Sequence, residues 1–175
     1  MTTMENMHKY DTAAGPISIV DNGRAITGIY FSKDPNLNRE PKHGRPLRHE
    51  KTELQQVALK QLNEYFEGKR TLFDLPLEPQ GTEFQMKVWR ELAKIPYGET
   101  RTYKQMAEAA GSPQGFRAAG LANNRNPVSI VLPCHRVIGS NGSLTGFGGG
   151  LDVKAKLLKM ELLVAGGFEA SYDGA

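Results

Sequence analysis

The order of hydrophobic and polar positions predicts that the chain opens with an antiparallel sheet. Apolar runs at 17–20 and 25–31 flank Asp21-Asn22-Gly23, and an Asn-Gly pair between two such runs is a strong hairpin signal. Residues 32–50 are polar and contain Pro35, Pro41, Gly44 and Pro46. We therefore expect an exposed connection there, without regular structure.

The apolar period becomes helical after Thr52. Apolar residues recur at helical spacing as far as Phe66, and Gly68 supplies the stop. Residues 73–77 can add a further strand. The polar run 78–81 then predicts a domain boundary, with an α/β domain at 1–81 and a second domain at 82–175.

The second half of the chain reads as short helices. One begins at the cap Thr82 and ends before Pro96, a second runs from Thr102 to Gly111, and a third from Pro113 to about Asn124. Two short helices joined by a tight glycine-containing turn are typical of a helix-turn-helix. A strand at 128–132, a glycine-rich loop at 139–150 and a helix capped by Asp152 complete the pattern.

Composition narrows the class of protein. The 175 residues suffice for one large or two small domains. Apolar runs near 18 residues and a secretory signal are both missing, so we expect a soluble protein of a reducing intracellular compartment. Residues 1–81 carry 11 basic and 11 acidic side chains, but 82–165 carry 11 and 6. This excess can serve a phosphate backbone, or it is an ordinary solvated face.

Cys134 is the chain's only cysteine and a candidate nucleophile. It cannot form an internal disulfide, and with four scattered histidines it makes a poor zinc site. A free cysteine is often just a small buried hydrophobe. The adjoining His135 and Arg136 favour reactivity instead, because both can stabilise a thiolate.

A carboxylate can serve this cysteine through His135. Glu161 lies on or beside an apolar stripe of the final helix that comprises Leu157, Leu158, Leu162 and Ala165. A charge there needs a partner, and a carboxylate that holds one imidazole nitrogen leaves the other free to accept a proton. Adjacent residues in an extended chain point to opposite sides, so a water would bridge His135 and Cys134. Alternatively, Glu161 reaches solvent and His135 is structural.

The third short helix has almost no side chains on one surface, which comprises Ala118, Ala119, Gly120 and Ala122. Such a surface can enter a narrow minor groove, where Arg117 would replace a displaced base. Arg101, Lys104 and Arg125 could then contact phosphates. Tight helix packing is the alternative explanation.

The loop at 140–150 contains five glycines in eleven residues, but no Lys-Ser or Lys-Thr follows them. It therefore lacks a nucleotide-binding fingerprint. Either it walls a pocket in which Phe147 grips a flat ring, or it is a mobile surface loop.

The run Pro133-Cys134-His135-Arg136-Val137, the upstream Asn126-Pro127 and the helix-turn-helix with Arg117 resemble the O6-alkylguanine-DNA alkyltransferase family. The resemblance covers about residues 82–165 closely, and the first half is similar in its hairpin, helix and length. It implies an α/β (α+β) fold. The N-terminal part is a ribonuclease H-like small antiparallel sheet with a helix, and the mostly helical C-terminal part carries a winged-helix-like helix-turn-helix.

The resemblance also implies direct-reversal repair of double-stranded DNA, bound through its minor groove. An alkyl group moves irreversibly from the O6 of guanine, or less readily the O4 of thymine, to Cys134, so each molecule acts once. His135 and Glu161 activate the thiol through a water, Asn126 braces the strand and turn, and Tyr103 pushes the 3′ phosphate. The implied DNA surface comprises Arg117, Tyr103, Ala118, Ala119, Gly120, Asn123 and Arg125, and the base pocket comprises Pro133, Val137, Phe147 and Gly148.

One position departs from the family pattern. Members usually carry a tyrosine where Phe147 stands, and its hydroxyl donates to the O6 of the departing guanine. Backbone amides near Gly148, or water, must then meet the charge that develops. The resemblance further implies a cytoplasmic monomer, nuclear in a eukaryote, that can bind DNA cooperatively and needs no metal or organic cofactor.

Two other functions are compatible with parts of this pattern. A non-catalytic sensor of alkylated bases would recruit other repair factors, but relatives of that kind lack the cysteine. A thiol hydrolase could use Cys134, His135 and Glu161, but it would not need a helix-turn-helix.

Overall fold

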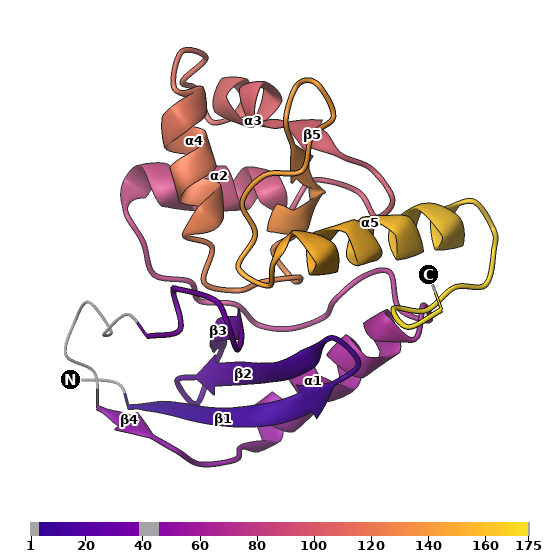
Figure 1. Ribbon diagram of the computed structural model, residues 1–175. Coiled ribbons are helices and arrows are strands. Elements are labelled where there is room, and N and C mark those ends of the chain that lie inside the picture. Colours follow the sequence, from indigo (N-terminus) through magenta and orange to yellow (C-terminus); the bar gives the residue numbers. More distant parts are fainter. Residues whose placement is uncertain (1–3, 39–45, 175) are drawn as a thin grey trace.

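The computed structural model describes residues 4–38 and 46–174. Figure 1 shows two halves, a twisted sheet with one long helix and, beside it, a group of helices that ends in α5. Both halves contribute to a single connected set of buried apolar side chains. The sheet half therefore forms part of the support for whatever site the helical half carries.

The sheet contains β1 (Glu5–Thr12), β2 (Gly15–Asp21), β3 (Ile26–Phe31) and β4 (Leu47–Arg48), in the order β3-β2-β1-β4. The predicted hairpin is confirmed as β2 and β3, which pair antiparallel. The expectation of no regular structure at 32–50 was wrong at β4, where the chain pairs with the outer edge of β1. Pro41 and Gly44 of that connection lie outside the described residues.

Helix α1 (Glu53–Phe66) follows the predicted pattern. Thr52 and Gln55 form a capping box at its start, and Gly68 takes a φ of +74° just after its end. The helix covers one face of the sheet, as Figure 1 shows. Ala58, Leu62, Tyr65 and Phe66 are buried.

The helical half contains α2 (Glu83–Leu92), α3 (Tyr103–Ala109), α4 (Phe116–Asn124) and α5 (Leu151–Ala165), with β5 (Arg101–Thr102) parallel to β6 (Val137–Ile138). The predicted cap Thr82 is confirmed, and Thr102, where the next helix was expected to begin, is the N-cap of α3. Helix α4 starts three residues later than predicted, because Gly115 N–H donates to Ser112 in a separate turn. Within the described residues, no helix combines the length and apolar character needed to cross a membrane.

The predictions of strands at 73–77 and 128–132 were wrong. Each is reduced to a bridge on β3, formed by Leu77 with Ile26 and by Val128 with Ile29. The second bridge is held by Ile29 N–H to Pro127 at 2.8 Å and Ser129 N–H to Ile29 at 3.1 Å. The edge of the N-terminal sheet therefore anchors the segment that leads to Cys134.

Candidate active site

Cys134 begins a short 3-10 helix, Cys134–Arg136, and does not lie in the extended backbone that the sequence suggested. Asn126 braces the approach, since its Nδ2 donates to Leu132 O at 2.7 Å and its Oδ1 accepts from Val128 N–H at 2.9 Å. Between these two bonds, Ile130 has a φ of +73°, a conformation that costs a β-branched residue about 1–3 kcal/mol. The turn is thus held in a strained shape by bonds on both sides.

The Cys134 thiol is only 6 % exposed. Burial raises its pKa to about 11, although a hydrogen bond from Asn126 and the charge of Lys154 act in the opposite direction. The expectation that His135 and Arg136 hold a thiolate is therefore wrong for the resting protein. The sulfur carries its proton at neutral pH, and a base must remove it.

His135 and Glu161 form the buried pair that the sequence predicted, with His135 Nε2 against Glu161 Oε2. Tyr65 also donates to Oε2, at 2.6 Å. Arg136 Nε at 2.7 Å and Gly98 N–H at 3.2 Å donate to Oε1. Burial alone would raise the pKa of Glu161, but His135, which is protonated at the low pH where this carboxyl titrates, and the permanently charged Arg136 outweigh it and lower this pKa to about 2. Glu161 is consequently ionised.

The ionised carboxylate fixes the tautomer of His135. Glu161 Oε2 can only accept a hydrogen bond, so His135 Nε2 carries the hydrogen and Nδ1 presents a lone pair. This Nδ1 is buried and has no hydrogen-bond partner among the described residues. Burial lowers the pKa of His135 more than Glu161 raises it. The imidazole is therefore neutral and able to take a proton.

Lys154 is a site residue that the sequence reasoning missed. Its buried Nζ donates to Val137 O at 2.6 Å and Thr145 O at 2.9 Å, and burial lowers its pKa to about 8. A signal was available, because Lys154 precedes Glu161 by seven residues and thus shares its helix face. This cation lies close enough to Cys134 to favour ionisation of the thiol.

The buried stripe of α5 differs from the predicted one. Lys154, Leu157, Met160 and Glu161 are buried, whereas Leu162 is 66 % exposed and Ala165 is also at the surface. The N-cap is Gly150, and Asp152 lies in the first turn. The prediction that the carboxylate of Glu161 lies on the core-facing side nevertheless agrees with its burial.

The glycine-rich loop is fixed at several points. Tyr103 OH donates to Thr145 O at 2.9 Å, and the Phe147 ring packs edge-on against Phe31 with centroids 5.4 Å apart. A Cβ at Gly148 would lie 2.4 Å from the Asp34 carboxylate, so a larger residue there would have to displace the Asp34 side chain. These contacts favour the predicted pocket wall over a mobile surface loop.

The remaining predicted pocket residues lie around the short 3-10 helix that carries Cys134. Pro133 and Val137 are buried on either side of the 3-10 helix. Phe147 is half-buried, and its ring centroid is 6.3 Å from that of His135. Cys134, His135 and Phe147 therefore come together, as the sequence predicted.

Helix α4 presents only part of the predicted DNA surface. Arg117 and Ala118 are exposed, and Gly120 and Arg125 are half-buried. Ala119 and Asn123 are 0 % and 2 % exposed, so their side chains cannot reach a groove. Ala119 was expected there because of the run of small residues, and Asn123 because of the family resemblance. This side of the helix instead packs inward, where Asn123 Nδ2 donates to Cys134 O at 3.4 Å.

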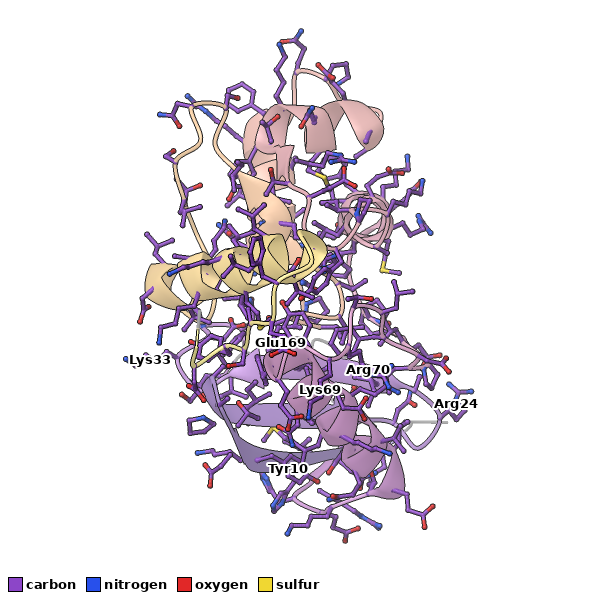
Figure 2. The ribbon with its side chains drawn as sticks, turned by 90° about the vertical axis from the view of Figure 1, so that its right-hand side faces the viewer. Tyr10, Arg24, Lys33, Lys69, Arg70 and Glu169 are labelled. Atoms are coloured by element: carbon purple, nitrogen blue, oxygen red, sulfur yellow. The ribbon has the colours of Figure 1, made fainter. Side chains whose placement is uncertain are left out.

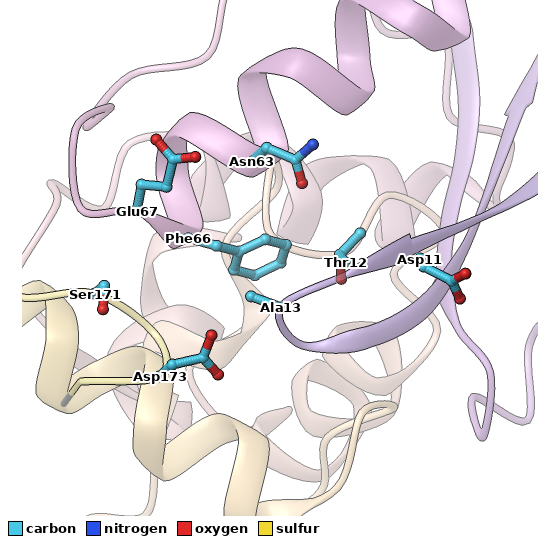
Figure 3. A pocket seen from close by; sticks show the side chains of 8 residues that line it. All are labelled: Asp11, Thr12, Ala13, Asn63, Phe66, Glu67, Ser171 and Asp173. Atoms are coloured by element: carbon cyan, nitrogen blue, oxygen red, sulfur yellow. The ribbon is translucent and has the colours of Figure 1, made fainter.

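A cavity of about 460 Å³ lies elsewhere, between the turn that joins β1 to β2, the end of α1 and the C-terminal segment (Figure 3). None of its lining residues belongs to the predicted site, and Asp11, Glu67 and Asp173 make it acidic. Three carboxylates repel a phosphate backbone. This cavity therefore does not extend a DNA-binding surface.

The fold and the site define a class of protein in which a helix-turn-helix half carries a buried cysteine served by a histidine–carboxylate pair. Comparisons with known proteins specify that class. Residues 83–163 match the family described as 6-O-methylguanine DNA methyltransferase, DNA binding domain, and residues 7–79 match its ribonuclease-like domain. The chain belongs to the 6-O-methylguanine DNA methyltransferase family.

Individual relatives agree with this assignment. The chain is 47 % identical to a methylated-DNA–protein-cysteine methyltransferase of Methanosarcina barkeri, over 86 % of this chain and 93 % of the relative. A Mycobacterium tuberculosis protein of the same name is 43 % identical, over 86 % and 88 %. The structure of M. tuberculosis OGT in complex with DNA superposes with a TM-score of 0.81 at 38 % identity, covering 91 % of this chain and 94 % of that one.

Proposed function

We propose that this protein repairs alkylated DNA by direct reversal, moving the alkyl group from O6-alkylguanine, or less readily O4-alkylthymine, to its own Cys134. The observation that carries the proposal is the single thiol beside a neutral imidazole whose Nδ1 is buried and unpartnered within the described chain. The methyltransferase names of relatives that match most of the chain support it.

The transfer is a displacement at carbon. His135 Nδ1 takes the thiol proton through a bridging water, and the resulting imidazolium is stabilised by Glu161. The sulfur then forms a bond to the alkyl carbon as the bond from that carbon to O6 breaks. The departing guanine receives the proton that His135 took from the thiol, relayed by water, so the imidazole returns to its neutral form and the products are a neutral thioether and neutral guanine. Because the thioether is stable, each molecule acts once and is an enzyme only in this single-turnover sense.

Lys154 and Asn126 lower the barrier to forming the thiolate. Both act against the burial that raises the pKa of Cys134. A buried positive charge and a directed amide stabilise the anion more effectively than water would, since the local dielectric is low. The resting site thus holds a protonated thiol, and these two side chains ease its ionisation.

The helix-turn-helix delivers the base. Arg117 and Ala118 on the exposed face of α4 enter the minor groove, and Arg117 takes the place of the extruded nucleotide. Tyr103 presses on the 3′ phosphate, and Arg125 contacts the backbone. The extruded guanine then lies between Phe147, Gly148 and the segment from Pro133 to Val137.

We propose that the protein acts as a monomer in the cytoplasm, or in the nucleus of a eukaryote. On this proposal it can also bind DNA cooperatively. Its chemistry needs neither a metal nor an organic cofactor, because thiol, base and leaving group are all supplied. We also place the domain division between residues 81 and 82, which is supported by family models that end at residue 79 and begin at residue 83.

Intact-protein mass spectrometry tests the proposal. Incubation with duplex DNA that contains O6-methylguanine should add one methyl mass to the peptide that holds Cys134, and Cys134→Ser should remain unmodified. A non-catalytic sensor would bind the duplex and gain no mass, and a hydrolase would turn over repeatedly. Demonstrated repair with an unmodified Cys134 would contradict the proposal.

A further inference from the structure

A tyrosine from the sheet half reaches the His135–Glu161 pair. Tyr65 lies near the end of α1 and is fully buried. Its hydroxyl donates to Glu161 Oε2 at 2.6 Å, and its oxygen is 3.3 Å from His135 Nε2. We propose that Tyr65 is a positioning residue that completes the proton relay from the N-terminal domain, an inference that rests on the function proposed above.

The surroundings hold the Tyr65 ring in place. Its centroid lies 5.6 Å from that of Phe66, 5.5 Å from that of Phe73 and 6.2 Å from that of Tyr97. A ring packed on three sides cannot rotate its hydroxyl away from the relay without opening the core. The hydroxyl is therefore a fixed donor to the carboxylate, in a site where an unmade hydrogen bond is costly.

The hydroxyl sets how strongly Glu161 attracts a proton on His135. Oε2 accepts from both Tyr65 and His135, so the tyrosine shares the negative charge that would otherwise act on the imidazole alone. The charged groups that face His135 are Glu161 and Lys154 from α5 and Arg136 from its own turn, and Tyr65 faces it from α1. Tyr65 thereby keeps His135 neutral, with its hydrogen on Nε2 and its lone pair on Nδ1.

Tyr65→Phe removes this hydroxyl and keeps the ring. Without it, Glu161 holds an imidazolium more tightly, so His135 should protonate at a higher pH. Tyr97→Phe is a matched control, because Tyr97 belongs to the same aromatic cluster and its buried hydroxyl has no hydrogen-bond partner among the described residues. Both variants keep their rings, including the Tyr97 ring that lies 5.5 Å from Arg136 Cζ, and they differ in whether the lost hydroxyl makes a hydrogen bond to the relay.

The measurement is the rate at which Cys134 is modified between pH 5 and pH 9, with iodoacetamide and separately with an O6-methylguanine duplex. In Tyr65→Phe the acid limb of both profiles should move up by about one pH unit, the scale of one charge-assisted hydrogen bond. Tyr97→Phe should follow the wild-type profile. In a Glu161→Gln background, Tyr65→Phe should produce no further shift, because Tyr65 acts through that carboxylate.

Failure of this inference is distinguishable from failure of the proposed function. A wild-type protein that accepts methyl groups, with Tyr65→Phe and Tyr97→Phe indistinguishable, would overturn the role of Tyr65 alone. A shifted iodoacetamide profile in Tyr65→Phe, with no methyl transfer even in the wild type, would support Tyr65 and reject the repair function. A shift that persists in the Glu161→Gln background would also overturn the inference.

Discussion

Asn126 and Leu132 are joined by a hydrogen bond of 2.7 Å, from Nδ2 to the backbone carbonyl, that closes the turn leading into Cys134. The same side chain accepts from Val128 N–H, and its amide lowers the pKa of the Cys134 thiol. One amide thus links the strained turn at Ile130 to the ionisation of the sulfur. The position of the nucleophile and its acidity are consequently coupled.

Asn126→Ala should impair both functions of this amide. Two buried backbone groups lose their partner, so we expect the free energy of unfolding to fall by about 2–4 kcal/mol. Alkylation of Cys134 should slow by roughly tenfold or more, because the thiolate loses a donor. Urea unfolding and methyl transfer from an O6-methylguanine duplex measure the two effects. Asn36→Ala is the control, since Asn36 makes its bond to Asn124 O at an exposed position. Equal losses in both variants would refute the coupling.

Lys154→Met should slow alkylation while largely preserving the length and apolar stem of the side chain. The buried ammonium lowers the pKa of Cys134 and holds Val137 and Thr145 together. Its loss should raise the thiol pKa further and reduce the rate at pH 7 by about tenfold or more. The pH dependence of iodoacetamide labelling checks this. Lys156→Met on the exposed side of the same helix should leave the profile unchanged.

Arg117→Ala should weaken repair of duplex DNA much more than reaction with the free alkylated base. Only the duplex requires a nucleotide to be extruded, which costs a few kcal/mol and corresponds to roughly a hundredfold in rate. Arg24→Ala is a suitable control, because Figure 2 places Arg24 in the sheet half, far from α3 and α4. If the two substrates suffer equally in Arg117→Ala, Arg117 does not act as a finger.

Phe147→Tyr should accelerate transfer, because it supplies a donor to the guanine oxygen at the position where the family resemblance led us to expect a tyrosine. The ring already packs edge-on against Phe31 and near His135, so an added hydroxyl changes polarity more than packing. We expect a gain of up to about tenfold in the rate with O6-methylguanine, a fraction of the effect that a fully engaged oxyanion donor has. Phe147→Leu, which removes the ring, should slow transfer. An unchanged rate in Phe147→Tyr would mean that backbone amides already meet the charge.

Local signals predicted the elements that local chemistry determines. The Asn-Gly turn between β2 and β3, the cap Thr82 and the helix starts near Thr52 and Thr102 were readable, because each depends on residues a few positions apart. The segment 128–132 was misread, since its apolar run resembles a strand while Asn126 and the edge of β3 force Ile130 into the left-handed region. Tertiary contacts there override propensity.

The candidate site also contains residues that the sequence predicted and residues that it did not. His135 with Glu161 was inferred from a charge on an apolar face, and the structure brings the two together. Tyr65 was not inferred, because nothing near it in sequence indicates a partner 96 positions away. The thiol pKa was misjudged for the same reason, since adjacent basic residues are visible in a sequence whereas the burial that outweighs them depends on the whole fold.

Acid should destabilise the protein through the buried relay. The Glu161 carboxyl has a pKa of about 2 in the folded protein, below its ordinary value of 4.5, so the unfolded chain binds the proton first as the pH falls. This stabilisation is complete above pH 4.5 and is lost toward pH 2, with a total of about 3 kcal/mol. The lowered pKa of His135 acts in the same direction below its ordinary value of 6.5, because the unfolded imidazole is protonated first.

Urea unfolding between pH 7 and pH 3 measures how steeply the free energy of unfolding falls with pH. Glu161→Gln should be less stable at pH 7 but decline less between pH 4.5 and pH 3, whereas the exposed Glu169→Gln (Figure 2) should follow the wild type. Parallel slopes for the wild type and Glu161→Gln would show that the carboxylate is not held ionised by the fold.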